Sequence, residues 1–381
     1  MSGTIQSRPQ DCVDRITLIG IATIQFWQPS FGLHWRVRTS SFRPESVPLF
    51  ARKTLEDSVS SSTAPIKAAI TDDPRLAKLD LVRQKLRGVI RGKDAVIDSI
   101  LTAILAGGSL LIEDVPGVGK TTLAKSIAAL IDLDFGRVQC TPDLLPADIL
   151  GSSIFQPATN KFEFRAGPIF CNLLIADEIN RASPRTQSAL LEAMAESQVT
   201  IDGECYKLNQ PFLVIATQNP SGFEGTFPLP ESQLDRFLLR LAMDYPDSSS
   251  EVEMLLDRTS DDPHSALKPV MNRDELIELQ AMARAATVDR KVAEYLVEIV
   301  SLTRVDSRLR IGCSPRGSKM LLRAAQAHAV LRGRGFVMPD DIQAMAELTI
   351  AHRVSPRSAS MPHRETAMII RELVDQVEVP V

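Results

Sequence analysis

Residues 109–130 read SLLIEDVPGVGKTTLAKSIAAL, and they are the most informative stretch of the 381-residue chain. A short apolar run predicts a buried strand, a loop that contains glycine follows it, and a helix-forming segment comes next. Such a loop turns several backbone N–H groups inward and creates an anion site at the N-terminus of the helix. The stretch therefore predicts a strand–loop–helix unit that binds phosphate.

The loop differs from the phosphate-loop pattern G-x-x-x-x-G-K-[ST] at one position, where Asp114 replaces the first glycine. That position only joins the strand to the loop, whereas Gly117 and Gly119 lie where the backbone must approach phosphate. Lys120 can reach the β- and γ-phosphates, and the hydroxyl of Thr121 can bind Mg²⁺. The alternative is a glycine-rich turn that Lys and Thr follow by chance. We interpret the loop as a nucleoside triphosphate site.

Two acidic residues end another apolar run, LLIADE at 173–178, which is typical of a buried parallel strand. Asp177 at the carboxyl end of that strand would hold the Mg²⁺ shell, and Glu178 would activate the attacking water. A strand that merely ends in solvated acids is the alternative. The distance along the chain from the phosphate loop fits one or two intervening βα units, which favours the magnesium interpretation.

Three further polar residues stand where a triphosphate could meet them. Asn219 follows the apolar strand FLVIAT at 212–217 and could hold the lytic water or sense the γ-phosphate, although Asn-Pro is by itself only a turn signal. Arg236 precedes another apolar strand and could complete the site of a neighbouring subunit, or else pair with Asp235 at a helix end. Arg316 lies in the first turn of a predicted helix, where a cation opposes the helix dipole. An anionic partner explains that arginine better than a surface ion pair does.

The order of the motifs resembles that of the MoxR family of AAA+ ATPases. The resemblance extends from about Asp72 to Val381. It implies an α/β fold, a P-loop AAA+ core with a parallel sheet between helices and two β-hairpin inserts, followed by an all-α lid domain. It also implies ATP and Mg²⁺ as cofactors. The motifs that carry it are EDVPGVGKT, TPDLLPADILG, LLIADEINRA, ATQNP, EGTFPLPESQLDRF and SPRGS.

The resemblance also assigns roles to individual residues of this chain. Glu178 completes the Walker B motif, and Asn219 corresponds to sensor 1. Arg236 corresponds to the trans-acting arginine finger, and Arg316 to sensor 2, which would contact the γ-phosphate bound by its own subunit. Arg240 is the second candidate for the finger, but the apolar strand pattern around it predicts that it faces solvent. The implied metal-binding residues are Thr121 and Asp177. The implied nucleotide contacts are Val89, Ile90, Pro116, Gly117, Val118, Gly119, Lys120, Thr121 and Thr122.

The composition limits the classes of protein that the chain can represent. With 43 Lys and Arg against 47 Asp and Glu, the formal net charge is −4, which offers no general attraction for nucleic acid. The five cysteines show no CxxC spacing, so we expect no zinc site or disulfide set, and we expect Cys140 and Cys171 to be small buried apolar residues. The apolar run at 16–27 is too short to span a bilayer, and no clear export cleavage site follows it. We therefore expect a cytoplasmic protein.

The chain divides into three expected regions. Residues 1–71 lack a sustained periodicity and contain a Ser/Thr-rich stretch. We expect them to form a poorly ordered extension, which could also be upstream sequence translated from a misassigned start. Helices and strands alternate over 72–247, the expected nucleotide-binding domain, and helical patterns dominate 248–381, the expected lid. Two hairpins are predicted within the α/β region, at 151–168 and 198–208.

The resemblance implies a ring-shaped homo-oligomer, with a hexamer expected, that binds MgATP between subunits and remodels protein clients. The implied role is chaperone-like, in maturing other complexes or inserting cofactors into them, with partner proteins that carry a von Willebrand A domain or are of the DUF58 type. A magnesium-chelatase-like subunit that drives metal insertion is the first alternative, because that family shares the two hairpins. A nucleic-acid motor or transcriptional activator is the second, but the sequence contains no GAFTGA loop.

Overall fold

The computed structural model describes residues 70, 72–113, 117, 119–219, 226–245, 248–249, 251–252, 267–358 and 361–380 of the chain. All of these belong to one compact unit, Ala64–Val381. Apart from its residue 70, the predicted extension at 1–71 lies outside the described residues, so the expectation for it stays a prediction.

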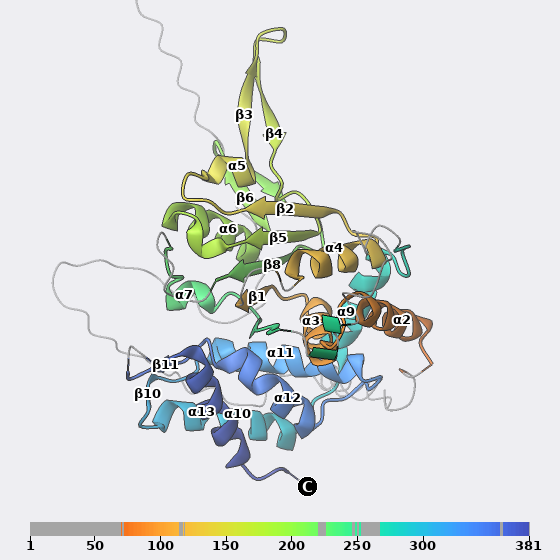
Figure 1. Ribbon diagram of the computed structural model, residues 1–381, viewed down its shortest axis with the longest axis vertical. Coiled ribbons are helices and arrows are strands. Elements are labelled where there is room, and N and C mark those ends of the chain that lie inside the picture. The colour runs from red at the N-terminus through yellow and green to blue at the C-terminus, as the bar shows by residue number, and fades with distance from the viewer. Residues whose placement is uncertain are drawn as a thin grey trace, which may run out of the picture. The chain divides into compact units, whose positions relative to one another are not determined.

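A five-stranded parallel sheet with strand order β2-β5-β8-β1-β9 forms the centre of the α/β region (Figure 1). Strand β5 is buried along its whole length, as expected for an apolar run that helices cover on both faces. Because all five strands run in one direction, their carboxyl ends share one edge of the sheet. The strands are β1 Leu110–Glu113, β2 Phe135–Gln139, β5 Leu173–Asp177, β8 Leu213–Gln218 and β9 Leu239–Leu241.

Helices cover the sheet and begin at recognisable sequence signals. The side chain of Asp73 accepts a hydrogen bond from the N–H of Arg75 and so caps α2. Ser183 caps α6 in a similar way, by accepting a hydrogen bond from the N–H of Thr186. The helices of this region are α2 Pro74–Val89, α3 Asp94–Leu105, α4 Lys120–Leu130, α5 Pro146–Leu150, the 3₁₀ helix η1 Ile179–Arg181, α6 Pro184–Glu196 and α7 Glu231–Leu234.

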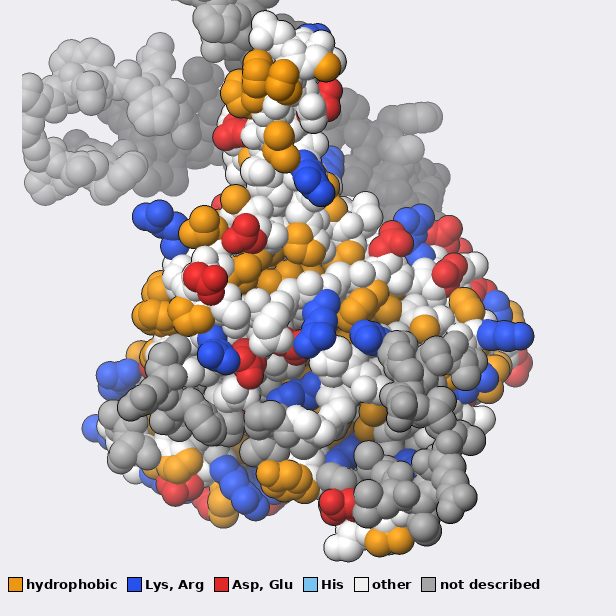
Figure 2. Space-filling model, turned by 45° about the horizontal axis from the view of Figure 1, so that its top comes forward, with side chains coloured by type: hydrophobic (Ala, Val, Ile, Leu, Met, Phe, Trp, Pro, Cys, Tyr) orange, Lys and Arg blue, Asp and Glu red, His pale blue; other side chains and the backbone are white. Residues whose placement is uncertain are grey.

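Both predicted hairpins are present, and together they form what we call the hairpin arm. The ring of Phe164 stacks on that of Tyr206, with the ring centroids 4.2 Å apart, so the two hairpins contact each other. Figure 1 shows β3 and β4 extending from the α/β region, and Figure 2 shows hydrophobic side chains gathered near the end of this hairpin. The antiparallel pairs are β3 Gly151–Gln156 with β4 Lys161–Ala166, and β6 Gln198–Ile201 with β7 Glu204–Lys207. The exposed hydrophobic residues of the first pair are Ile154, Phe155 and Phe162.

The lid region is mainly helical, as predicted, but it also contains a two-stranded antiparallel sheet, β10 with β11. Sequence patterns did not indicate these strands, because they are too short to show a periodicity. None of the helices in the described part of the chain is both long and apolar enough to cross a membrane. The elements are α9 Arg273–Ala285, α10 Arg290–Val305, β10 Leu309–Ile311, α11 Pro315–Leu331, α12 Pro339–Ile350, β11 Ser355–Pro356 and α13 His363–Asp375.

Two cysteines lie in the core, as predicted. Cys140 and Cys171 are 1% and 4% exposed, and burial raises the pKa of both thiols to about 12. The cysteines in the described part of the chain are free. Both residues therefore pack as small apolar side chains that stay protonated at neutral pH.

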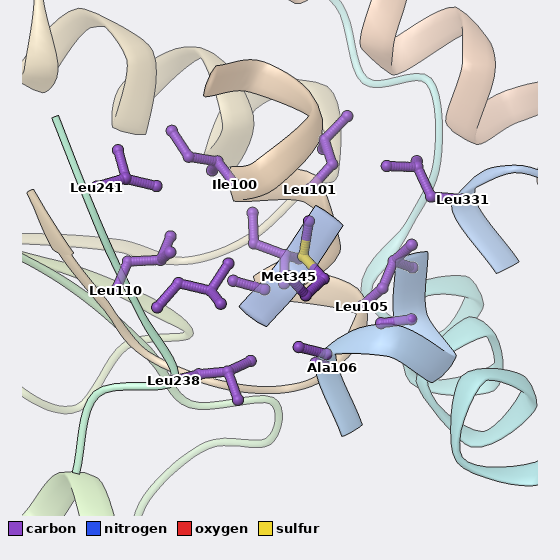
Figure 3. Close-up of a cluster of buried hydrophobic side chains, with 14 of the residues drawn as sticks. Ile100, Leu101, Leu105, Ala106, Leu110, Leu238, Leu241, Leu331 and Met345 are labelled. Carbon is purple, nitrogen blue, oxygen red and sulfur yellow. The ribbon is translucent and has the colours of Figure 1, made fainter. Parts of the chain in front are cut away.

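One hydrophobic cluster, which we call the shared core, joins the α/β region to the lid. Figure 3 shows Leu105 of α3 and Leu110 of β1 in the same group as Leu331 of α11 and Met345 of α12. Because the cluster contains side chains from both regions, we expect the two regions to unfold together. Its labelled members are Ile100, Leu101, Leu105, Ala106, Leu110, Leu238, Leu241, Leu331 and Met345.

Leu105→Ala tests the role of the shared core. Leu105 is 1% exposed, so the substitution should lower the free energy of unfolding by about 2–5 kcal/mol through lost burial and a new cavity. The measurement is chemical denaturation followed by circular dichroism and by the binding of a fluorescent ATP analogue. Leu81→Ala is the matched control, because Leu81 is 43% exposed on α2 and its loss should change stability by no more than about 0.5 kcal/mol. Two separate transitions in the native chain would contradict a core that both regions share.

Candidate nucleotide site

The phosphate loop connects β1 to α4 at the carboxyl edge of the sheet. Gly117 and Gly119 have φ values of 87° and 89°, in the left-handed region that favours glycine, and Gly119 is the N-cap of α4. A Cβ atom added to Gly119 would lie 3.5 Å from Cδ1 of Ile90, so this candidate for the adenine pocket lies beside the loop. Two other predicted contacts, Pro116 and Val118, lie outside the described residues.

The acidic residues follow one another at the end of β5. Asp177 is its last residue and is 7% exposed. Glu178 has a φ of 57°, a left-handed conformation that is uncommon for a residue with a side chain and often occurs at functional sites. The N–H of Glu178 donates to Oγ1 of Thr217 on β8 at 2.9 Å, and that oxygen lies 3.4 Å from Oδ1 of Asp177. These contacts hold both carboxylates beside the end of β8.

A cleft of about 380 Å³ lies between the phosphate loop and the ends of β2, β5 and β8. It brings together most of the predicted phosphate, metal and water-activating residues, although they come from three separate segments of the sequence. Val89 and Ile90 are not among the residues that line it. The lining residues are Gly117, Gly119, Lys120, Thr121, Thr122, Arg137, Gln139, Asp177, Glu178, Thr217 and Asn219.

Glu178 is the most extensively hydrogen-bonded acid of the cleft. Nδ2 of Asn219 donates to Oε1 at 3.1 Å, whereas Arg181 and Gln139 donate to Oε2 at 2.9 Å and 3.2 Å. Burial raises the pKa of Glu178, but the hydrogen bonds from Arg181 and Asn219 and the charges of Arg181 and Lys120 outweigh it, and the pKa is lower than usual. The side chain is therefore a carboxylate at neutral pH and can accept a hydrogen bond from water.

Sequence reasoning missed two cleft residues on β2, Arg137 and Gln139. Nε of Arg137 donates to Oδ2 of Asp177 at 2.9 Å, and Gln139 is the strand partner of Asp177 in the register. A signal for them existed, because both are polar and flank the buried Val138 in an alternating strand pattern. Only the pairing of β2 with β5 shows that this polar face meets the acidic residues.

The donor set of the cleft suits a magnesium-bound triphosphate. Mg²⁺ in nucleotide sites takes few protein ligands and completes its shell with phosphate oxygens and water. Thr121 and Asp177 can supply such ligands, and Lys120 faces the same cleft. Among the residues that the structure describes, no group of three or more His, Cys, Asp or Glu could hold a metal ion by itself. Thr121 and Asp177 therefore fit a Mg²⁺ ion that phosphate oxygens also bind.

The two candidate arginines, Arg236 and Arg316, lie outside the cleft. One guanidinium N–H of Arg236 donates to the carbonyl of Leu191 in α6 at 2.6 Å. Nε of Arg316 lies 3.5 Å from Oδ2 of Asp235, and its side chain is 51% exposed. Arg316 is thus paired with the residue next to Arg236, whereas its sequence assignment was to the γ-phosphate of its own subunit. The sequence alone could not show that the start of α11 lies beside the end of α7.

The prediction that Arg240 faces solvent is wrong. Its side chain is 11% exposed and forms an ion pair with Glu113, the last residue of β1. The two residues belong to neighbouring strands of the sheet, so the carboxylate compensates the charge that the strand buries. Arg240 is therefore paired within its own subunit.

Comparison with known proteins supports the class that this fold and this cleft define. The sequence model described as "ATPase family associated with various cellular activities (AAA)" matches residues 109–239, and that of the AAA lid domain matches residues 301–373. The crystal structure of a protein assigned as an ATPase from Cytophaga hutchinsonii is similar with a TM-score of 0.74 and 32% sequence identity, over 88% of this chain and 100% of that chain. The class is that of the AAA+ ATPases with a C-terminal lid.

Curated relatives narrow the class to a family. YeaC, an uncharacterized protein of Bacillus subtilis, is 47% identical over 299 residues, which cover 78% of this chain and 93% of YeaC. The chaperone MoxR1 of Mycobacterium tuberculosis is 38% identical over 71% of this chain and 74% of its own length. The protein MoxR of Paracoccus denitrificans is 31% identical over 76% of this chain and 91% of its own length. The chain belongs to the MoxR family of AAA+ ATPases, as its motifs indicated.

Arg181→Met tests the electrostatic environment of Glu178. Because Arg181 lowers the pKa of Glu178, its loss should raise that pKa. A water-activating carboxylate works when ionised, so the fall of the ATPase rate on acidification should begin at a higher pH. The measurement is the pH–rate profile, with circular dichroism at each pH to verify that the chain is folded.

The control for this experiment is Arg185→Met, which removes an exposed arginine of α6 that does not affect the pKa of Glu178. Its profile should match that of the native chain. An unchanged acid limb in Arg181→Met would contradict a rate-determining role for ionised Glu178.

Proposed function

We propose that the chain binds and hydrolyses MgATP. The observation that supports this most directly is the single cleft that Lys120, Thr121, Asp177, Glu178 and Asn219 line together. Hydrolysis of a nucleoside triphosphate requires a phosphate cradle, a metal ligand and a group that orients water, and in this proposal these side chains would supply all three.

Each side chain has a part in the transfer of the γ-phosphoryl group to water. Lys120 would neutralise charge on the β- and γ-phosphates, while Thr121 and Asp177 would hold Mg²⁺. When bound, the metal supplies positive charge to the phosphate oxygens. Glu178 would accept the proton of the attacking water. Nδ2 of Asn219, which lies 3.1 Å from the Glu178 carboxylate, would fix the orientation of that carboxylate.

We also propose a ring of subunits, with a hexamer expected, built from a nucleotide-binding domain at 72–247 and a lid at 248–381. Arg236 and Arg316 support this proposal, because neither lines the cleft of its own subunit and Arg316 pairs with Asp235, the residue before Arg236. Both guanidinium groups would then reach the γ-phosphate held by the neighbouring subunit. For Arg316, this replaces the expectation of a role within its own subunit.

The proposed client is a protein that the ATPase remodels in the cytoplasm, in a chaperone-like role that includes cofactor insertion or maturation of other complexes. The exposed hydrophobic end of the hairpin arm supports a protein client, because such patches commonly mark protein contacts. One of the relatives is itself named a chaperone. The proposed partner carries a von Willebrand A domain or is of the DUF58 type. Metal insertion of the magnesium-chelatase type is the alternative.

Two substitutions separate nucleotide binding from hydrolysis. Lys120→Ala should abolish ATP binding, because the loop keeps its shape but loses the charge that faces the phosphates. Glu178→Gln should still bind ATP, but its rate of hydrolysis should fall by about 10²–10⁴-fold because water activation is lost. Binding is measured with a fluorescent ATP analogue, and hydrolysis by phosphate release.

Glu192→Gln provides the matched control, since Glu192 is exposed on α6 and away from the cleft. It should bind and hydrolyse ATP like the native chain. If Glu178→Gln also hydrolysed ATP at the native rate, Glu178 would not be the group that activates water.

Mixed rings test the role of Arg236 across the subunit interface. Arg236→Ala alone should bind ATP and lose about 10³–10⁵-fold in hydrolysis, the usual contribution of an arginine finger. Mixing it with Lys120→Ala, which is inactive by itself, should restore part of the activity. At one kind of interface an intact ATP site then meets an intact finger.

The formation of mixed rings is verified by crosslinking differently tagged subunits. The restored rate should rise and fall with the mixing ratio and be greatest where mixed interfaces are most frequent. Mixed rings that stay inactive at every ratio would exclude action of Arg236 on the neighbouring site.

A further inference from the structure

A buried arginine of the lid binds the segment that carries Arg236. Arg353 follows α12, and its side chain is 1% exposed. Its Nε donates to Oδ1 of Asp235 at 2.9 Å, and its terminal N–H groups donate to the carbonyls of Leu238 at 3.1 Å and of Asp235 at 3.2 Å. The carbonyl of Phe237 accepts a further hydrogen bond from the same guanidinium.

Four of the six acceptors around the Arg353 guanidinium belong to residues 235–238 between α7 and β9. The other two are the carbonyl of Thr349 and Nε2 of His352, both in the lid. Burial of a guanidinium is unfavourable unless its N–H donors are satisfied, and this segment satisfies most of them. The neighbouring His352 adds to the contact, with its Nε2 lying 3.1 Å from the Phe237 carbonyl. A planar guanidinium that donates to several carbonyls fixes both the distance and the orientation of the backbone that carries them.

The same segment is also attached to the α/β region. The N–H of Leu238 donates to the carbonyl of Ser109 at 2.7 Å, and the side chain of Leu238 lies in the shared core (Figure 3). Arg236 itself donates to Leu191 in α6. The backbone around Arg236 is therefore held between the sheet on one side and Arg353 of the lid on the other.

We propose that Arg353 is a positioning residue that sets the place of the Arg236 finger according to the position of the lid. In this arrangement, the lid of one subunit controls ATP hydrolysis in the neighbouring subunit. The inference rests on the proposed action of Arg236 across the subunit interface.

Asp235 also contacts the second candidate arginine, Arg316, which lies in the lid as Arg353 does. Its carboxylate accepts from Arg353 through Oδ1 and lies 3.5 Å from Nε of Arg316 through Oδ2. One carboxylate thus links the buried guanidinium to an exposed one beside the finger. Arg316 belongs to α11 of the lid, so the carboxylate of Asp235 connects the segment around Arg236 to the lid at a second point.

The test places Arg353→Lys in only one kind of subunit of a mixed ring. We call Arg236→Ala the acceptor, because it keeps an ATP site and lacks a finger, and Lys120→Ala the donor, because it keeps a finger and binds no ATP. Lysine retains the charge of Arg353 but cannot hold several carbonyls in a plane. Arg353→Lys in the donor should lower the restored kcat by about 10²-fold, the effect of a displacement near 1 Å, and leave the KM for ATP unchanged. Arg353→Lys in the acceptor should leave the restored rate equal to that of the mixed ring in which Arg353 is unchanged.

Asp235→Asn in the donor is the second variant, in case Arg353→Lys fails to fold. It keeps the size of the side chain but removes the charge that Arg353 binds. Like Arg353→Lys, it should lower the restored rate when it is in the donor and not when it is in the acceptor. The control is Arg371→Ala in the donor, since Arg371 is an exposed arginine of α13 that pairs with Glu347 of α12. It should leave the restored rate unchanged. Crosslinking and thermal denaturation verify that all mixed rings assemble and are folded.

Three results would overturn the inference. A loss of equal size from Arg353→Lys in the donor and in the acceptor would show that Arg353 only stabilises the fold. No loss in the donor would show that the place of Arg236 does not depend on Arg353. Absence of restored activity in the parent mixture, without any change at position 353, would exclude the action of Arg236 across the interface and the inference with it. That last outcome is recognised before Arg353 is changed, so the two failures are distinguishable.

Discussion

The central sheet is covered by helices on both faces, and this constraint leaves its strands few places for polar side chains other than their ends. Parallel strands share one carboxyl edge, so the polar residues that follow β1, β5 and β8 are forced together there. Asp177, Thr217 and the phosphate loop meet at this edge although they are far apart in the sequence. The cleft is thus a direct result of how the strands are ordered and buried.

The sequence predicts those parts of the molecule that depend on local signals. Strand β5, the phosphate loop and both hairpins follow from runs, glycines and turns that a short window contains. Arg137 and Gln139 could not be placed, because their role depends on the register between β2 and β5. The burial of Arg240 was missed for a similar reason, since its partner Glu113 lies on another strand. The positions of Arg137, Gln139 and Arg240 all depend on contacts between segments that are far apart in the sequence.

Apolar and polar contacts contribute differently to the boundary between the lid and the α/β region. The shared core brings the two regions together, but hydrophobic contact is non-directional and does not by itself fix how one surface is placed on another. The guanidinium of Arg353 adds direction, because its N–H groups must point at particular carbonyls of 235–238. A buried charge at this boundary therefore gives the boundary one preferred alignment.

The stacking of Phe164 on Tyr206 has a mechanical consequence. The β3–β4 hairpin leads into β5, which ends in Asp177, and the β6–β7 hairpin leads into β8, which ends just before Asn219. A second tie between the hairpins is the hydrogen bond of Ser153 to Asp202, at 2.6 Å. A load applied to the tip of one hairpin is consequently divided between two strands, and both of those strands end at the cleft. The arm therefore connects its tip to two strands whose carboxyl ends line the cleft.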